Sequence, residues 1–291
     1  MTTLLSGLEI ICLLAIAVFG VPHGAYDYEF IKTATKERGS NFALMIAAYL
    51  TLVILSLVLW FVAPTFSILI FLIISTYHFG AADPLSFGVE SKNLKSLAIF
   101  SIIMQGGLTT TFLPLLHWTT FSQYLTDLQS NSEILFSWLA LSSLLWAISA
   151  LVVFKNLFYT NQKGKLAVTL LICLLVWIMK PLLFFALFFC CSHAWSHYKK
   201  SMRHLSSGVL LPSASFFTTT ILAWVLIIIV SFGFFPISGD ELEFMLSPNL
   251  LRGVFASLFA LTVPHILVVD FMVPSRGRSE VLDIEQDGFT S

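Results

Sequence analysis

The sequence predicts an all-α protein, a polytopic membrane bundle of about nine transmembrane helices. Hydrophobic residues make up 57% of the 291 positions and charged residues only 11%, whereas soluble domains carry about 25% charged residues. The mean hydropathy of +0.91 agrees with this class. The apolar residues also fall into long runs, and a spanning helix needs about 20 of them.

The apolar runs follow one another along a single predicted transmembrane domain, residues 1–273, which precedes a polar tail, residues 274–291. In order, the predicted spans are 8–30, 42–63, 66–83, 96–116, 134–155, 166–180, 181–200, 216–236 and 250–272. The sixth and seventh spans are separated only by Lys180-Pro181. Proline breaks a helix interior, so we expect a tight turn there. A continuous helix at this point would reduce the count to eight.

The basic residues support nine spans, because most of them then lie on one side of the membrane. The other side receives only Lys180 and Arg252. The positive-inside rule predicts a plasma (inner) membrane protein with its N-terminus outside and its C-terminus in the cytoplasm. The cytoplasmic loops and tail carry Lys32, Lys36, Arg38, Lys92, Lys95, Lys155, Lys163, Lys165, Lys199, Lys200, Arg203, Arg276 and Arg278.

Other features of the composition exclude several classes of protein. The net charge of −1, with no basic domain, argues against a nucleic-acid partner. The four cysteines all lie in apolar spans without a C-x-x-C pair, so we interpret them as small buried hydrophobes. The N-terminus has no Lys/Arg-rich region, and a cleaved signal peptide is not expected.

Histidines inside the apolar spans are the strongest functional signal. Ionisable side chains at bilayer depth are costly and usually mark a pathway, a proton relay or a cofactor site. The five lie on spans 1, 3, 7 and 9, which all run towards the cytoplasm, at a similar predicted depth. A shared metal ion is therefore predicted, although each histidine taken alone could simply hydrogen-bond between helices. These five are His23, His78, His193, His197 and His265.

His193 and His197 form the sharpest motif among them. They are four residues apart, so both project from one helix face, the spacing with which a helix offers two ligands to one metal. Imidazole suits zinc, copper, iron and nickel alike. The two remaining histidines, His117 at the end of span 4 and His204 in a basic loop, are interpreted as ordinary surface residues.

Three carboxylates follow histidines at short spacing. Metal-binding histidines usually donate their second N–H to a carboxylate or a carbonyl. Asp27, four residues after His23, is the best placed for this role. Asp83 and Asp270 could equally belong to the cytoplasmic interface.

Two features beside the histidines have less specific interpretations. Phe185 and Phe189 continue the helix face of His193 towards the N-terminus, so they could line an apolar substrate pocket, although core packing explains the stripe as well. Gln105, followed by two glycines, is interpreted as supporting close helix packing rather than chemistry. Pro22 and Pro264, each just before a histidine, are expected to disturb the helix locally.

Four sequence blocks together resemble the Brp/Blh family of β-carotene 15,15′-dioxygenases. The resemblance implies a multi-pass enzyme that uses Fe²⁺ and O₂ to cut β-carotene at its central double bond, giving two all-trans-retinal molecules for a microbial rhodopsin. It implies iron ligands at His23, His78, His193 and His197, and leaves His265 as a fifth ligand, a supporting residue or a substrate contact. The blocks are G-V-P-H-G-A-Y-D (20–27), Y-H-F-G-A-A-D (77–83), H-A-W-S-H (193–197) and V-P-H-I-L-V-V-D (263–270).

The chemistry of that reaction agrees with the histidine pattern. Cleaving an alkene with O₂ needs a redox-active metal, which favours iron over zinc. A membrane desaturase or hydroxylase with two irons is an alternative, but such enzymes carry several histidine boxes and only one H-x-x-x-H occurs here. A haem protein would need histidines facing each other in pairs. The non-enzyme alternative is a transporter or an assembly factor for a retinal protein, with the histidines as a proton relay.

Overall fold

The computed structural model describes residues 5–82, 95–205, 213–233 and 248–272, and the regular backbone in these ranges is entirely helical, with no strand. The all-α class is therefore confirmed. Short 3₁₀ or π segments connect several helices: η1 (Ile16–Gly20), η2 (Val21–Tyr26), η3 (Leu108–Phe112), η4 (Phe188–Ala194) and η5 (Leu267–Met272). The α-helices are α1 (Gly7–Ala15), α2 (Asp27–Arg38), α3 (Phe42–Val62), α4 (Pro64–Ala82), α5 (Lys95–Gly107), α6 (Leu113–Leu116), α7 (Trp118–Asp127), α8 (Ser132–Tyr159), α9 (Lys163–Ile178), α10 (Pro181–Leu187), α11 (Trp195–Leu205), α12 (Ala214–Gly233) and α14 (Pro248–Ile266).

Seven helical stretches among the described residues are long and apolar enough to cross a membrane. They correspond to the first five and the last two predicted spans, which makes the chain a multi-pass membrane protein. The count of about nine is not confirmed. The seven stretches are Gly7–Arg38, Phe42–Val62, Pro64–Ala81, Leu97–Leu116, Ser132–Tyr159, Ala214–Gly233 and Pro248–Asp270.

The two predicted spans outside this group are those on either side of Lys180-Pro181. Helix α9 has only 16 residues, which is about 24 Å at 1.5 Å per residue and shorter than the hydrocarbon core of about 30 Å. The path from α10 through η4 to α11 is longer but carries polar and basic residues near its end. The predicted break itself is present, because Met179 and Lys180 both have extended backbone and α10 begins at Pro181.

The first predicted span, 8–30, lies within a longer helical path. Ser6 caps its start: the Ser6 hydroxyl accepts a hydrogen bond from the Glu9 N–H, and the Glu9 carboxylate accepts one from the Ser6 N–H. This reciprocal box satisfies two backbone donors at the helix start. The path continues to Arg38 and ends at Gly39, whose φ of 63° is the left-handed conformation that terminates many helices.

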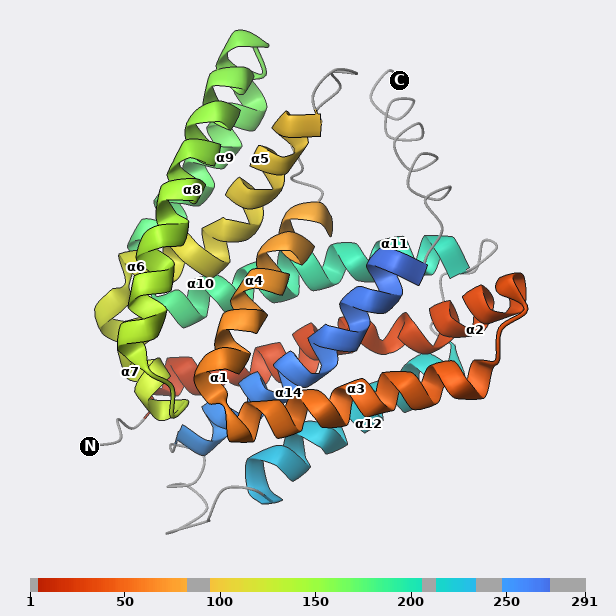
Figure 1. Ribbon diagram of the computed structural model, residues 1–291. Coiled ribbons are helices and arrows are strands. Elements are labelled where there is room, and N and C mark those ends of the chain that lie inside the picture. Colours follow the sequence, from red (N-terminus) through yellow and green to blue (C-terminus); the bar gives the residue numbers. More distant parts are fainter. Residues whose placement is uncertain (1–4, 83–94, 206–212, 234–247, 273–291) are drawn as a thin grey trace.

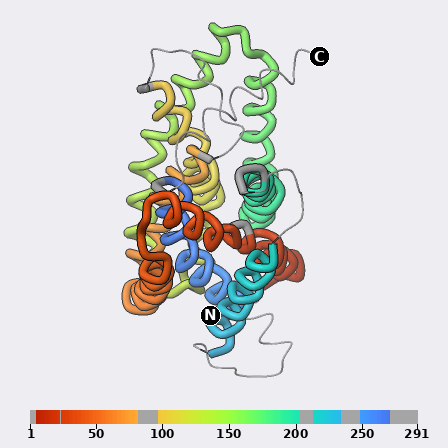
Figure 2. Tube along the Cα trace, turned by 90° about the vertical axis from the view of Figure 1, so that its right-hand side faces the viewer, coloured from red at the N-terminus to blue at the C-terminus, as the bar shows by residue number. Residues whose placement is uncertain are grey.

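Helix α14 forms the centre of the bundle. Figure 1 shows it crossing between α3, α4 and α12. Of the most apolar 18-residue stretch in the span Pro248–Asp270, 61% is buried. Helices α8 and α9 form an antiparallel pair beside α5, and the view turned by 90° shows this pair rising to one end of the molecule (Figure 2). The most buried helix is thus the one that carries His265.

The outer surface is apolar, as expected for a protein surrounded by lipid tails. Leu151 is 70% exposed on α8, Trp177 69% exposed on α9 and Val62 78% exposed on α3. Exposing such side chains to water would be unfavourable by about 25 cal/mol per Å². Lipid removes this cost, so the exposed apolar faces are compatible with a stable fold in a bilayer.

The helices that carry the histidines run in the same direction. In Figure 1, α1–α2, α10–α11 and α14 all run from left to right, and α4 starts at the same end. The alternation of predicted spans 1, 3, 7 and 9 requires this arrangement. It allows histidines at matching distances along the four helices to meet at one level.

Irregular backbone occurs at several of the candidate site residues. His23 lies in the 3₁₀ segment η2 next to Pro22, His193 in the π segment η4, and Asp270 in the π segment η5. Short π segments inside α-helices occur often at functional sites. The expected disturbance at Pro22 is present, whereas Pro264 remains inside regular helix α14.

Helices α4 and α5 approach each other through two glycines. A Cβ atom on Gly80 would overlap the Ile102 carbonyl, and one on Gly106 would overlap the Thr76 carbonyl. The Thr76 and Thr110 hydroxyls, 2.6 Å apart, also hydrogen-bond across this contact. Small residues permit such backbone contact between membrane helices. Gly106, next to Gln105, therefore has the packing role expected for this segment.

Candidate metal centre

Four buried imidazole rings from three separate helical segments meet in the interior. His78 comes from α4, His193 and His197 from the path η4–α11, and His265 from α14. The ring of His78 lies 5.0 Å from that of His193, 5.3 Å from that of His265 and 6.5 Å from that of His197, measured between ring centres. The ring of His197 lies 4.9 Å from that of His265 and 6.3 Å from that of His193. We call these four residues the histidine cluster.

Each side chain of the histidine cluster is almost completely shielded. The exposed fractions are 1% for His78, 2% for His193, 7% for His197 and 2% for His265. An imidazole in such surroundings must find a hydrogen-bonding or metal partner, because burying an unpaired polar group costs roughly 1–3 kcal/mol. The cluster therefore needs compensating interactions.

Asp27 supplies one of these interactions, to His265. The His265 Nδ1–H donates to the Asp27 carboxylate at 2.8 Å, and the Tyr49 hydroxyl donates to the same carboxylate at 2.9 Å. The hydrogen bond fixes the tautomer of His265 and leaves its Nε2 as the atom that can bind a metal. Asp27 was expected to support His23, its neighbour on the same helix, and the structure gives it His265 as a partner.

Asp270 lies beside a histidine of another helix in the same way. The His78 Nδ1 is 3.5 Å from the Asp270 Oδ2, and the side chains are 1% and 6% exposed. The two groups are therefore neighbours without a hydrogen bond between them. Neither ring nitrogen of His78 nor the Asp270 Oδ2 has a hydrogen-bond partner. Asp83, the acid nearest to His78 in the sequence, lies outside the described residues.

The other two histidines are held by a hydroxyl and by aromatic rings. The Ser201 hydroxyl and the His197 Nδ1 are 3.3 Å apart, one helical turn from each other. His193 stacks on Phe189 with 5.8 Å between ring centres and meets Phe79 edge to face at 4.7 Å. These contacts restrict the rotation of both rings.

The spacing of the histidine cluster can be compared with that of a metal site. Imidazole nitrogens about 2.1 Å from a shared ion place the ring centres roughly 4.5–6.5 Å apart. The measured separations of 4.9–6.5 Å fall in this range. Among the described residues, however, no group of three or more His, Cys, Asp or Glu side chains is already arranged to hold an ion. The spacing of the rings thus fits a shared ion, whereas the ring nitrogens do not converge on one point.

Charge also fits a cation at this place. The buried carboxylates of Asp27 and Asp270 lie against two of the imidazoles, and the Asp270 Oδ2 lacks a hydrogen-bond donor. A buried anion is costly unless an opposite charge compensates it. A divalent ion bound by the imidazoles would supply that charge, so the residues present fit a metal.

His23 is part of the predicted ligand set, but its side chain lies outside the described part of the structure. Its backbone belongs to η2, three residues after Gly20, where a Cβ would collide with the Phe189 ring. A Cβ added to Gly24, the next residue, would lie 3.4 Å from the His265 Nδ1 and 3.5 Å from the Asp27 carboxylate. The chain at His23 therefore passes beside the histidine cluster.

Of the two histidines expected at the surface, the structure describes the side chain of His117 but not that of His204. The His117 ring Nε2 is 2.8 Å from the Val176 carbonyl, and the ring is only partly exposed. His117 thus connects the segment after η3 to α9 rather than lying free at the surface. His204 is in α11, and its side chain lies outside the described part.

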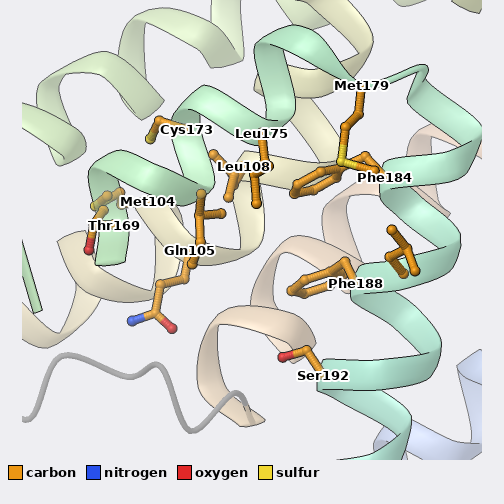
Figure 3. A pocket seen from close by; sticks show the side chains of 12 residues that line it. Met104, Gln105, Leu108, Thr169, Cys173, Leu175, Met179, Phe184, Phe188 and Ser192 are labelled. Atoms are coloured by element: carbon orange, nitrogen blue, oxygen red, sulfur yellow. The ribbon is translucent and has the colours of Figure 1, made fainter. Parts of the chain in front are cut away.

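The aromatic stripe predicted for a substrate pocket packs in the core. Phe189 is 2% exposed, and Phe185 stacks on it at 5.5 Å between ring centres. An apolar cavity of about 230 Å³ lies against the neighbouring face of the same helix, lined by Phe184 and Phe188 together with residues of α5 and α9 (Figure 3). The two phenylalanines that line the cavity are thus each one position before the predicted Phe185 and Phe189.

Sequence reasoning missed Tyr49 and Ser201. Tyr49 lies on the apolar span α3, and no local pattern connects it with Asp27, 22 positions earlier. Ser201 follows His197 by four residues. That spacing is a usable local signal, because residues four apart share a helix face.

The fold and the site define a class of protein: a multi-pass helical membrane protein with a buried cluster of imidazoles and carboxylates. The sequence matches the family described as beta-carotene 15,15′-dioxygenase over residues 14–273. It is also 32% identical, over 277 residues, to the beta-carotene 15,15′-dioxygenase of the uncultured marine bacterium 66A03, covering 90% of this chain and 93% of that protein. No solved structure gives a significant match.

The chain belongs to the beta-carotene 15,15′-dioxygenase family. The four sequence blocks that carried the resemblance all fall inside the matched region. Three of those blocks contribute the four rings of the histidine cluster.

Proposed function

We propose that the protein is an iron-dependent dioxygenase that cleaves β-carotene at the central 15,15′ double bond with O₂, giving two molecules of all-trans-retinal. The observation that carries this proposal is the cluster of four buried imidazoles on membrane-capable helices, in a chain of this family. Membership in a family of enzymes argues against the transporter and assembly-factor alternatives.

The metal would be held by His78, His193 and His197, with His23 as the fourth ligand. His265 lies within the same ring spacing as the others, so we include it as a further ligand or as a residue that touches the substrate. Bound Fe²⁺ would supply the ability to bind and activate O₂, which zinc lacks. Imidazole ligands are neutral, so the charge of the dication is balanced by Asp27 and Asp270.

The protein's own residues would orient the histidine rings and exclude water from the site. The Asp27 carboxylate holds His265 in one tautomer, and Ser201 and Phe189 restrict His197 and His193. The 1–7% exposed fractions of the rings keep bulk water away from the reaction. Excluding water protects a reactive oxygen species from side reactions, and orientation of the reactants lowers the barrier further.

A site inside the bilayer suits the proposed substrate. β-Carotene is a hydrocarbon that dissolves in lipid, so it can reach the cluster laterally between helices. We propose that the protein lies in the plasma membrane with the N-terminus outside and the C-terminus, including tail residues 274–291 beyond the described part, in the cytoplasm. The support is the one-sided distribution of Lys and Arg. The retinal would serve a microbial rhodopsin, a link that rests on the family resemblance.

Expression in a bacterial host that accumulates β-carotene tests the proposed function. The expected result is loss of the orange colour with one retinal pair formed for each β-carotene consumed, measured by chromatography of cell extracts. Labelling with ¹⁸O₂ should place one labelled oxygen in each retinal. Unchanged β-carotene in cells whose membranes contain the protein would contradict the proposal, and a Soret band in the purified protein would indicate haem instead.

A further inference from the structure

An apolar cavity lies between α5, α9 and the α10–η4 path, close to the histidine cluster. It measures about 230 Å³, below the roughly 300–1,000 Å³ of pockets that enclose whole drug-sized ligands. Leu187, which lines the cavity, is 47% exposed on the apolar outer surface of the molecule. A second hollow of about 420 Å³ shares Cys173 with it. The cavity can therefore receive part of a long apolar molecule from the bilayer.

The cavity is separated from the histidine cluster by one aromatic contact. Phe188 lines the cavity and meets Phe79 edge to face, with 5.4 Å between ring centres. Phe79 in turn lies 4.7 Å from the His193 ring and 6.2 Å from the His78 ring. Ser192, also on the cavity wall, directly precedes His193. One end of the cavity thus adjoins the candidate metal centre.

Gln105 is the one amide among the residues that line the cavity. Its side-chain nitrogen and oxygen are both fully enclosed, and neither has a hydrogen-bond partner. Figure 3 shows the Gln105 amide and the Ser192 hydroxyl at one end of the cavity and Met179 at the other. An unpaired buried amide costs roughly 1–3 kcal/mol. Close helix packing does not explain it, because the neighbouring glycine provides that packing.

A ligand that satisfies this amide must combine a long apolar body with one hydrogen-bonding oxygen at the end near the histidine cluster. β-Carotene has no oxygen and leaves the amide unpaired. Each retinal has an aldehyde oxygen on the carbon of the cleaved bond, which is the end nearest the metal. The rest of that half-molecule would extend along the apolar wall towards Met179.

We propose that this cavity is the binding site for one retinal product and that Gln105 donates a hydrogen bond to its new aldehyde oxygen. The inference rests on the proposed function, because it takes its ligand from that reaction. β-Carotene offers the Gln105 amide no hydrogen-bond acceptor. The aldehyde oxygen of the retinal product would supply one. Gln105 thus recognises the product and is not itself a metal ligand.

Binding to the purified wild-type protein in lipid nanodiscs tests the inference without catalysis. The probes are all-trans-retinal and the matching C20 hydrocarbon with a methyl group in place of the aldehyde, followed by quenching of tryptophan fluorescence. We expect wild type to prefer the aldehyde by about tenfold, in line with one buried hydrogen bond. Equal affinities for the two probes in wild type would overturn the inference.

The variant Gln105→Met keeps the unbranched shape of the side chain and removes the amide. We expect its affinity for retinal to fall to that of the hydrocarbon, while its affinity for the hydrocarbon stays within about twofold of wild type. The matched control is Gln123→Met on α7, an exposed glutamine outside the cavity, which should keep the wild-type preference. A tenfold preference that survives in Gln105→Met would also overturn the inference.

The result can be separated from that of the carotene-cleavage experiment. If wild type forms retinal in cells but the two probes bind equally, the cavity assignment fails and the proposed function stands. If the probes are discriminated through Gln105 but no β-carotene is cleaved, the proposed function fails and the cavity remains a site for an apolar aldehyde.

Discussion

The Nδ1 of His265 donates a hydrogen bond to the carboxylate of Asp27 at 2.8 Å, although the two residues are 238 positions apart. His78 and Asp270, from two other parts of the chain, lie 3.5 Å apart without a hydrogen bond. Each carboxylate therefore contacts a histidine of another helix. Removing a carboxylate that orients a metal-binding histidine typically costs 10–100-fold in metal affinity or activity.

The variant Asp27→Asn should reduce retinal formation by about 10- to 100-fold. An asparagine can present its NH₂ group to His265, which would turn the ring or select the wrong tautomer. Retinal produced per unit of membrane protein, together with iron content, measures the effect. Tyr49→Phe removes only the second hydrogen bond of Asp27 and should cost a few-fold at most. Full activity of Asp27→Asn would mean that this carboxylate has no supporting role.

The variants His193→Ala and His197→Ala should abolish retinal formation, with losses exceeding the roughly 100-fold of a supporting residue. Both rings belong to the histidine cluster, and alanine offers no atom that could bind the metal in their place. The comparison is His117→Ala, which loses the hydrogen bond to the Val176 carbonyl but should remain active. The measurement is retinal in extracts at equal protein levels in membranes. Activity of a well-expressed His193→Ala protein would remove His193 from the ligand set.

Metal removal should inactivate the purified enzyme reversibly. A chelator that strips Fe²⁺ should stop retinal formation, and adding back Fe²⁺ should restore it, whereas Zn²⁺ should bind without restoring activity because it has no redox chemistry. Metal analysis should find about one iron per chain in active protein. Activity that survives complete removal of transition metals would contradict the iron proposal.

The variant Gly106→Leu should destabilise the α4–α5 contact by about 1–3 kcal/mol, as expected for overpacking. Its side chain would overlap the Thr76 carbonyl, two residues from His78. Thermal unfolding in detergent should therefore start at a lower temperature than for wild type. The control is Gly164→Ala on α9, whose added Cβ meets nothing within 4 Å; it should be neutral or stabilising by about 0.4–1 kcal/mol. Wild-type stability of Gly106→Leu would argue against this close approach of the helices.

The sequence predicted those features that depend on residues close together in the chain. The apolar runs predicted an all-α membrane bundle, the Lys180-Pro181 step predicted the break before α10, and the four-residue spacing of His193 and His197 placed both on one helix face. The number of spans was harder to predict. Helix α9, at the sixth predicted span, has only 16 residues, so the count of about nine is not confirmed.

Only the tertiary structure decided which partner each histidine has and which helix face meets the cavity. Spacing along one helix suggested Asp27 as a partner for His23, and only the packing of α14 against the first helical path showed that Asp27 also bonds His265. Phe184 and Phe188, rather than Phe185 and Phe189, line the cavity. A helix that is apolar on every side does not indicate which face is buried. Helix orientation is determined by contacts between distant segments, and these contacts leave no periodic signal in the chain.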